Sequence, residues 1–205
     1  MGTPPVTTAP IFGLRKTWVD PGPGIAMVWA HYTWSAPGAA PDWADAEQVV
    51  LAPSDGGPRR TAVLEVPRTE LSLHYFFFVV TAGDRAASPI FTEEVVAREI
   101  TYADPDGAYT SVGVMWNADG ETPNYTSMAM DGLPFESVGE APEEGSIYEF
   151  VRAQPLPHVF RGTVWGVRGS SVRYGYHLIR HGRPDPADNA ESWDDNAGAG
   201  WVVEL

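Results

Sequence analysis

The sequence predicts an all-β protein built from two tandem immunoglobulin-like antiparallel β-sandwich domains, the first covering residues 1–100 and the second residues 101–205. Three observations lead to this fold class. The 205 residues include 21 Gly and 19 Pro, and the prolines are spread along the chain, which leaves little room for long helices. Short apolar and aromatic runs alternate with turn clusters such as APSDGGP and NADGETP, as in sandwich proteins. Several segments of the first half also recur, in the same order, in the second half.

The recurring segments indicate two copies of one domain of about 100 residues. Three pairs of segments match: DPGPGIAMVWAH (20–31) with DPDGAYTSVGVMWN (104–117), RTAVLEV (60–66) with RGTVWGV (161–167), and LHYFFFVV (73–80) with VRYGYHLI (172–179). These matches pair Trp29 with Trp116 and Tyr75 with Tyr174. Any single match could arise by chance, but the shared order favours a duplication.

Each copy contains a series of strand-like runs separated by turn-forming Gly, Pro, Asn and Asp. In chain order the runs are 25–34, 48–52, 60–66, 73–80 and 90–96 in the first copy, and 111–118, 125–132, 162–167, 172–179 and 200–205 in the second. The run 172–179 alternates apolar and polar side chains, which predicts a strand with one buried face. The run 73–80 is apolar on both faces, so we expect the interface between the domains to cover its outer face. The linker 98–105 has no Gly/Ser stretch, which favours domains that pack together.

The charge of the chain restricts the partners that it can bind. It has 13 Lys and Arg against 27 Asp and Glu, a net charge of -14. This balance argues against nucleic acid, which is bound by neutralising phosphates, and against anionic membranes. No run reaches the roughly 20 apolar residues of a membrane span, and the N-terminal residues lack the regions of a secretory signal. We therefore expect a neutral partner, no nucleic acid, no membrane, no transmembrane segment and no signal peptide.

Motifs for catalysis and metal binding are absent from the sequence. There is no Cys, no G-x-S-x-G, no H-E-x-x-H, no P-loop and no G-x-G-x-x-G, so we predict no catalytic residue, no metal site and no cofactor. His177 and His181 are four residues apart, but the spacing runs from a strand into a turn and does not form a metal pair. The acidic stretch 132–150 is predicted to be a solvated loop, with a cation- or partner-binding loop as the alternative.

Tryptophan is the residue type that points to a function. The chain has 8 Trp, more than two small sandwich cores need. Trp18 and Trp165 fit core positions, whereas Trp34 and Trp43 flank a turn-like segment and Trp193 is surrounded by Asp, Asn and Gly. An aromatic ring in a polar loop can stack on the C–H face of a sugar, and such aromatic anchors dominate binding energy.

The C-terminal order VRYGYHLIRHG…ESWDDNAGAGWVVEL resembles the C-terminal half of the starch- and glycogen-binding carbohydrate-binding modules. Those modules end with a Tyr-containing strand, a turn and a W-D-N-N-x-G-x-N-Y motif before the last strand. Here the motif reads Trp193, Asp194, Asp195, Asn196 and Gly198, then Trp201. The second Asn of the motif is missing, Trp201 stands where a Tyr is usual, and the first copy has ASPIFTEEVV instead.

The resemblance implies an α-glucan site. In one branch of these modules the Trp of the motif stacks on the glucan, and a His and a second aromatic residue from an early strand and loop complete the site. The ligand-binding residues implied for this chain are Trp193, Asp195, Asn196, Trp116, Trp34 and His31. Because His31 and Trp193 belong to different copies, the sequence leaves open whether they share one site. The first copy has no counterpart of the ESWDDN loop in the sequence, which favours Trp193 as the site and a structural role for Trp201.

Three functions are compatible with the sequence. The first is non-catalytic binding of a polysaccharide, most simply an α-glucan, by aromatic stacking and hydrogen bonds. The second is a protein-interaction or structural module of paired immunoglobulin-like domains. The third is a small sugar-active enzyme that uses His and carboxylate side chains between the domains, where sites often form. The identity of the glycan, the oligomeric state and the compartment remain open.

Overall fold

The computed structural model describes residues 11–19, 24–53, 59–117, 126–132, 159–180 and 190–205. Within these ranges every regular element is a β-strand and every strand pairing is antiparallel, which confirms the all-β, antiparallel prediction. The strands are β1 (Ile11–Val19), β2 (Ile25–Ser35), β3 (Glu47–Val50), β4 (Ala52–Pro53), β5 (Arg59–Pro67), β6 (Leu71–Thr81), β7 (Arg85–Ala87), β8 (Phe91–Ala103), β9 (Ser111–Asn117), β10 (Thr126–Ala129), β11 (Asp131–Gly132), β12 (Val159–Val167), β13 (Ser171–Arg180), β14 (Ala190–Asp194) and β15 (Trp201–Glu204). The described residues contain no helix that is long and apolar enough to cross a membrane.

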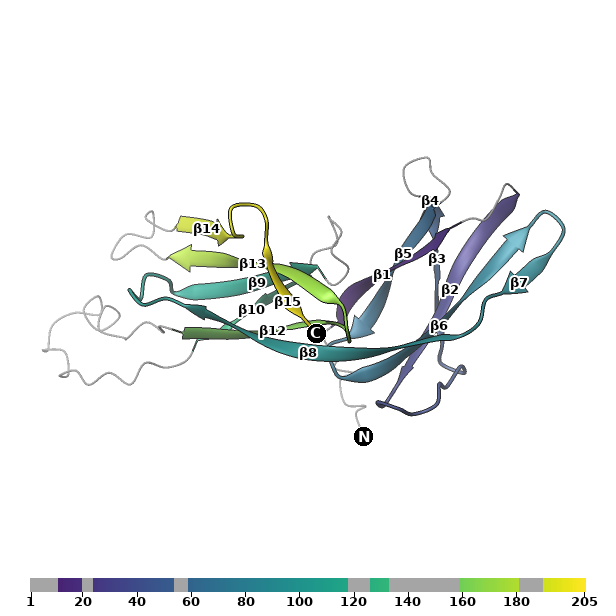
Figure 1. Cartoon of the computed structure of the whole chain (residues 1–205), viewed down its shortest axis with the longest axis horizontal. Helices are drawn as coiled ribbons and strands as arrows, with labels where there is room; N and C mark the ends of the chain where they lie inside the picture. The colour runs from purple at the N-terminus through teal and green to yellow at the C-terminus, as the bar shows by residue number, and fades with distance from the viewer. Residues whose placement is uncertain (1–10, 20–23, 54–58, 118–125, 133–158, 181–189) are drawn as a thin grey trace, which may run out of the picture.

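The strands form three sheets, and strand β8 belongs to both halves of the molecule (Figure 1). The sheet orders are β1-β5-β4, then β10-β9-β13-β14 with β15 also on β13, and β11-β12-β8-β6-β2-β3 with β7 also on β6. Residues 91–95 of β8 pair with β6, and residues 95–103 pair with β12. The expected linker 98–105 therefore starts as strand, and the expected boundary at residues 100 and 101 falls inside β8. We name β1–β7 with residues 91–95 the first half, and the remainder the second half.

The strand pairings of the first half recur in the second half. In the first half β1 pairs with β5, β2 with β6, and β6 with β7 and the start of β8. In the second half β8 pairs with β12, β9 with β13, and β13 with β14 and β15. The short strands follow the same scheme, since β3 and β10 lie on β2 and β9, and β4 and β11 lie on β5 and β12.

The residue-by-residue alignment of this repeat differs from the sequence prediction. Tyr75 pairs with Tyr32, and Tyr174 pairs with Trp116, so Trp116 stands at the position of Tyr32. Trp29 pairs with Phe78, and its position in the second half is taken by Gly113, which pairs with His177. The predicted match of Trp29 with Trp116 is therefore wrong, because it is three residues out of register and reverses the two faces of the strand.

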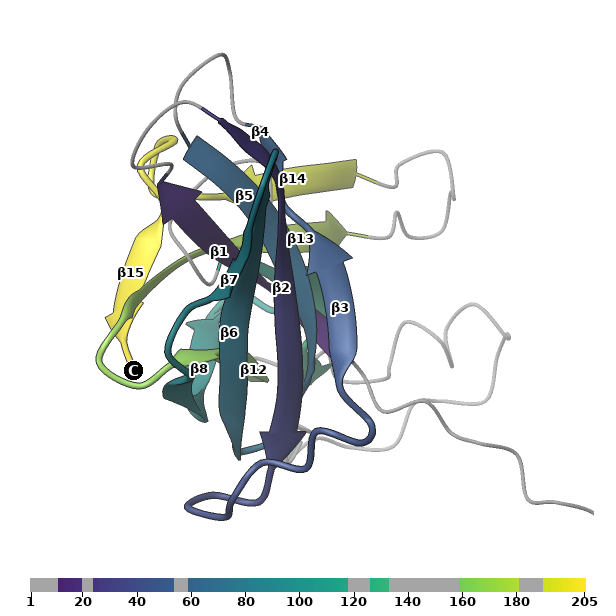
Figure 2. The same cartoon turned by 90° about the vertical axis from the view of Figure 1, so that its right-hand side faces the viewer.

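The core is one continuous cluster that fills the space between facing sheets. Figure 2 shows β1 and β5 lying across the sheet that holds β2 and β6. In the first half the buried side chains come from alternate positions of these strands: Phe12, Leu14, Val28, Ala30, Tyr32, Leu64, Val66, Leu73, Tyr75, Phe77 and Val79. In the second half they are Ile100, Val112, Val114, Trp116, Phe160, Val164, Val172, Tyr176 and Leu178. This alternation buries one face of each strand, as expected for packed antiparallel sheets.

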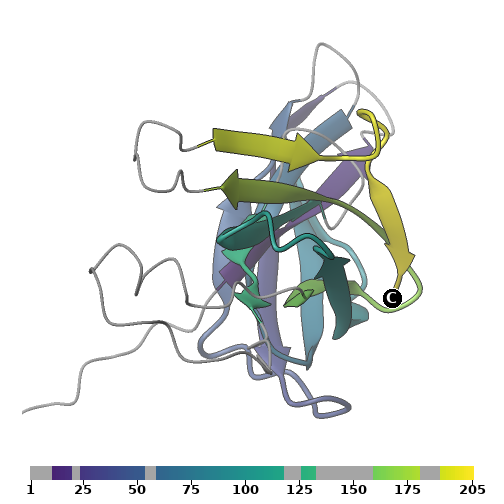
Figure 3. The same ribbon diagram turned by 90° about the vertical axis from the view of Figure 1, so that its left-hand side faces the viewer.

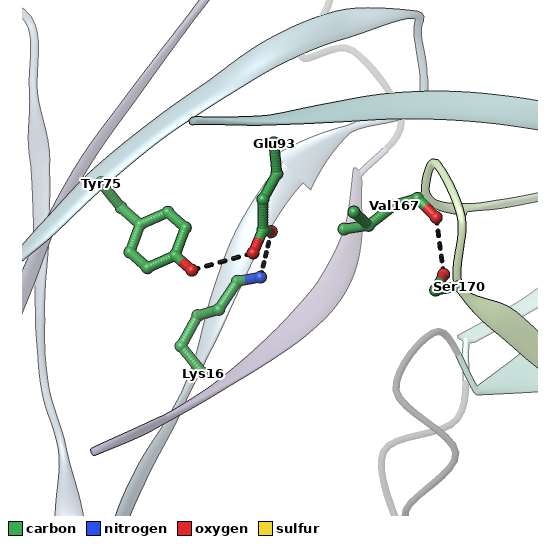
Figure 4. A network of polar contacts seen from close by, with 5 residues as sticks. All are labelled: Lys16, Tyr75, Glu93, Val167 and Ser170. Carbon is green, nitrogen blue, oxygen red and sulfur yellow. Dashed lines mark hydrogen bonds and ion pairs between the residues drawn. The ribbon is translucent and has the colours of Figure 1, made fainter. Parts of the chain in front are cut away.

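A polar network closes one edge of the first half between its two sheets (Figure 4). The Lys16 ammonium on β1 forms an ion pair with Glu93 on β8, and the Tyr75 hydroxyl donates a hydrogen bond to the same carboxylate at 2.8 Å. Burial, together with the charge of Glu93, raises the pKa of Tyr75 above its ordinary value. The register places Val203 in the second half where the first half has Glu93. The same view shows the Ser170 hydroxyl donating to the Val167 carbonyl at 2.6 Å, in the β12–β13 turn.

The two halves also meet through side chains near β8. The Arg68 guanidinium, in the β5–β6 turn, lies 5.3 Å from the ring centroid of Trp116, and burial lowers its pKa. The Arg168 backbone N–H donates to the Glu94 carbonyl at 2.8 Å. This junction does not cover the outer face of β6, where Phe78 contacts Trp29 at 5.7 Å. The predicted cover of that face by the second domain is therefore wrong, because side chains of the first half pack there instead.

Candidate functional site

Trp193 lies on β14, at the edge of the sheet that forms the outer layer of the second half. Figure 3 shows β13 and β14 side by side, and the register places Trp193 directly opposite His177. The two rings stack with centroids 4.3 Å apart and an interplanar angle of 17°. Trp193 nevertheless remains 53% exposed. The indole is thus held in one orientation by the imidazole while much of its surface faces solvent.

A hollow of about 390 Å³ lies beside this stacked pair. We name it the Trp193 hollow; it is lined by Ser111, Gly113, Val114, Met115, Met128, His177, Ile179 and Trp193. Gly113 gives it depth, because a Cβ there would lie 3.7 Å from the His177 Cβ and 3.4 Å from the Met128 carbonyl oxygen. The His177 Nε2 atom lies 3.3 Å from a Glu191 carboxylate oxygen, which orients the imidazole under Trp193.

Asp195 and Asn196 begin the turn that joins β14 to β15, and their polar groups hold that turn together. The Asp195 carboxylate accepts a hydrogen bond from the Gly198 N–H at 2.9 Å, and the Asn196 amide donates to the Gly200 carbonyl at 3.3 Å. Asn196 and Ala197 have φ of 53° and 57°, a left-handed conformation that costs about 1 kcal/mol for each residue that is not glycine. The structure therefore gives both side chains a turn-forming role, and their contact with a ligand stays a prediction.

Two of the predicted ligand-binding tryptophans face the core. Trp116 is fully buried, and its indole N–H donates to the Trp165 carbonyl at 3.1 Å. Trp34 is partly buried against the core, with its ring 6.0 Å from that of Tyr32. The Trp116 assignment is wrong, because the strand alternation turns this ring into the core and leaves it no exposed face for a ligand. Trp34 keeps part of its surface exposed, so its contact with a ligand stays a prediction.

His31, another of the predicted ligand-binding residues, also lies at a surface hollow, but this hollow is on the first half. Its ring stacks on Phe76 with centroids 5.0 Å apart and an interplanar angle of 4°. We name this second hollow, of about 450 Å³, the Trp43 hollow; it is lined by His31, Trp43, Ala46, Phe76, Ala87, Ser88 and Ile90. In the part of the chain that the structure describes, the two hollows share no lining residue. The structure therefore does not bring His31 and Trp193 into one site.

Two contributors to the Trp193 hollow were missed at the sequence level. The sequence predicts neither His177 nor Gly113 as a ligand-binding residue. Both belong to the site because β9, β13 and β14 are neighbours in one sheet. The exposed face of the alternating run 172–179 included position 177, but the residue opposite it depends on the β13–β14 register. The sequence does not reveal that register.

The described residues contain a partly buried Ser–His pair and no cluster of metal ligands. Among them, no group of three or more His, Cys, Asp or Glu side chains could hold a metal ion. Buried His74 contacts the Ser35 and Thr92 hydroxyls at 3.0 Å each, and Ser35 also donates to the Ala39 carbonyl at 2.9 Å. Neither partner of His74 is a carboxylate that could stabilise an imidazolium, so the array holds the loop after β2. His181 and most of the acidic stretch 132–150 lie outside the described residues.

Comparisons with known proteins supply no relative from which a function could be transferred. No protein-family model, no curated protein and no solved structure matches the chain.

Proposed function

We propose that this chain is a non-catalytic polysaccharide-binding protein with Trp193 as its stacking platform and an α-glucan as its ligand. Two tandem immunoglobulin-like sandwiches that share β8 would form its scaffold. The observation that carries the proposal is the Trp193 ring, which stacks on His177 at 4.3 Å and is still 53% exposed. An indole that is fixed before binding loses little conformational entropy when a sugar ring stacks on it.

The chemistry of the Trp193 hollow suits a sugar. Its walls combine apolar groups from Met115, Met128 and Ile179 with the hydroxyl of Ser111 and the imidazole of His177. Sugars present an apolar C–H face together with hydroxyl edges, and ligand sites commonly pair apolar walls with a few polar groups. The α-glucan class comes from the resemblance of the segment around Trp193 to starch- and glycogen-binding modules.

The charge of the chain separates a sugar from a nucleobase as the stacking partner. Bases of single-stranded nucleic acids also stack on aromatic side chains, but these proteins add a basic groove for the phosphates. This chain has a net charge of -14, and none of the described residues that line the Trp193 hollow is Lys or Arg. A neutral ligand therefore fits the hollow better than an anionic one.

Affinity gel electrophoresis tests the proposal. The protein is run in native gels with and without soluble starch, glycogen or an unrelated neutral glycan, and its mobility gives the dissociation constant. We expect retardation by the α-glucans, and Trp193→Ala to weaken binding by about 2 kcal/mol or more, about thirtyfold, as for other aromatic hot spots. Trp193→Phe, which keeps a ring, should lose less.

The control is Val63→Ala, which removes an exposed apolar side chain from β5, outside both hollows. It should migrate like the wild type. The absence of retardation by every glycan would refute the proposed function and favour the protein-interaction alternative. Release of reducing sugar from the gel polysaccharide would favour the sugar-active enzyme instead. Normal binding by Trp193→Ala would show that the site is placed wrongly.

A further inference from the structure

The Trp43 hollow lies over the strands of the first half that are equivalent to those under the Trp193 hollow, on the same outer face. We propose that it is a second binding site for a neutral glycan, so that one chain binds two glycan segments and can cross-link a polysaccharide. This inference rests on the proposed function, because it assigns the same ligand class to a second surface.

The two hollows lie on equivalent outer faces. The Trp43 hollow is formed on β2, β6 and β7, and the Trp193 hollow on β9, β13 and β14. The register makes these strands equivalent, because β2 and β7 flank β6 as β9 and β14 flank β13. Ala87 on β7 is opposite Phe78, just as Trp193 on β14 is opposite His177. The same backbone arrangement thus presents a concave outer face twice.

Both hollows are built around a stacked pair of one His and one aromatic ring. In each half the two residues are directly opposite each other on neighbouring strands, His31 with Phe76 and His177 with Trp193. The planes are nearly parallel in both pairs, at 4° and 17°. In the Trp43 hollow the ring of Trp43, from the loop between β2 and β3, meets Phe76 edge-on at 5.2 Å. Trp43 therefore forms an aromatic wall beside an aromatic floor.

The lining of the Trp43 hollow selects for an uncharged occupant. Among the described residues that line it, none is Asp, Glu, Lys or Arg, on a chain with a net charge of -14. Its volume of about 450 Å³ falls in the range of small-molecule sites, about 300–1,000 Å³. The imidazole of His31 supplies a polar group for hydroxyls, whereas the Ser88 hydroxyl is already engaged by the Phe77 N–H and the Pro89 carbonyl. A sugar ring matches this combination of aromatic faces and one polar edge.

The position of the two hollows makes cross-linking the expected consequence. Figure 1 shows β7 and β14 at opposite ends of the long axis of the molecule. A short oligosaccharide would therefore occupy each hollow separately. A branched polymer with many ends would be joined to further polymer molecules through the protein, with the avidity that two linked sites provide.

The test combines stoichiometry with precipitation. Equilibrium dialysis with a malto-oligosaccharide measures the number of sites, and the turbidity of protein mixed with glycogen measures cross-linking. We expect two sites per wild-type chain, and one in Trp43→Ala and in Trp193→Ala. Each single variant should still bind glycogen in affinity gels but should lose most of the turbidity, and the double variant should lose both.

Thermal unfolding of each variant shows whether it is folded, which is the control. His31→Ala provides an independent change in the Trp43 hollow. Two remaining sites in both Trp43→Ala and His31→Ala, with undiminished turbidity, would overturn the inference. One site in the wild type that only Trp193→Ala removes would also overturn it while leaving the proposed function intact. No binding by the wild type would instead refute the proposed function itself.

Discussion

The outer faces of the two halves share one strand scheme but carry different side chains. On the first half, Trp29 and Phe78 are opposite each other in the middle of the sheet. The equivalent positions on the second half are Gly113 and His177, and the large ring is Trp193, on the edge strand. The first half therefore has an aromatic floor, whereas the second has an open floor and an aromatic wall.

This difference shows how a repeated scaffold can form a hollow in two ways. Removing a side chain at Gly113 deepens the sheet surface, although glycine in a strand weakens it by about 0.5–1 kcal/mol relative to alanine. Gly175, at the position of Phe76, has a second effect. A Cβ there would lie 3.4 Å from the Cβ of Asp195, so glycine lets the β14–β15 turn approach β13. Gly113 and Gly175 therefore reduce the packing on the outer face of the second half, and they leave room for Trp193 and the β14–β15 turn.

The largest difference in stability is expected between variants of Trp116 and of Trp29, two residues that the sequence pairs with each other. Trp116→Ala should destabilise the protein by about 3–5 kcal/mol, because a fully buried ring is replaced by a cavity and the contact with Arg68 is lost. Trp29→Ala, on the outer face, should cost about 1 kcal/mol or less. Urea unfolding followed by far-ultraviolet circular dichroism gives both values. Equal losses would mean that the outer face is packed as tightly as the core.

A second test concerns the edge where the first half has Glu93 and the second half has Val203. Glu93→Val removes the acceptor of the Lys16 ammonium and the Tyr75 hydroxyl, and both groups are partly buried. We expect a loss of about 2 kcal/mol from these unpaired groups. Adding Lys16→Met should recover at least half of it, since an apolar pair can replace a partly buried ion pair.

A double-mutant cycle in chemical denaturation measures this coupling between Lys16 and Glu93. Thr101→Val, an exposed change on the part of β8 that belongs to the second half, is the control. Strictly additive losses from the two single variants would show that the ion pair does not stabilise the edge.

The fold class could be predicted because the signals for strands and turns are local. Alternation in 172–179 and the turn clusters between the runs depend only on neighbouring residues, and β13 (Ser171–Arg180) contains that run. The residue-by-residue alignment of equivalent strands in the two halves could not be predicted in the same way. A shift by an odd number of residues exchanges the two faces of a strand, and local signals do not exclude such a shift. The match of 60–66 with 161–167 pairs Val63, which is 37% exposed, with fully buried Val164. The similarity between the two segments therefore located the strands correctly, but it aligned an exposed position with a buried one.

The candidate site was predictable only in part, for a related reason. The polar surroundings of Trp193 in the sequence are consistent with its exposure, but its partner His177 is set by strand register. The sequence predicts that the ESWDDN segment is an addition to the second copy. In the structure its first residues form β14, which is equivalent to β7. What distinguishes the second half is therefore the residues on an existing strand, rather than an inserted element.

The smallest effect is expected for Gly113→Val, which partly refills the floor of the Trp193 hollow. A Cβ at this position has room, with the His177 Cβ 3.7 Å away, so the strand should gain up to about 1 kcal/mol of stability from a β-branched residue. The same methyl groups would occupy the space beside His177 and lower the affinity of the Trp193 hollow about tenfold, or about 1.4 kcal/mol. The Trp43 hollow should keep its affinity, because Gly113 is not part of its lining.

Thermal unfolding and equilibrium dialysis of Gly113→Val separate these two effects, with Thr101→Val as a β-branched control outside the hollows. A more stable variant with unchanged affinity at both sites would mean that the ligand contacts Trp193 without entering the floor. A less stable variant would mean that the Met128 carbonyl, 3.4 Å from the new Cβ, cannot move. Higher stability with weaker binding would show that Gly113 contributes to ligand binding through the depth of the hollow, because the glycine itself lowers the stability of the strand.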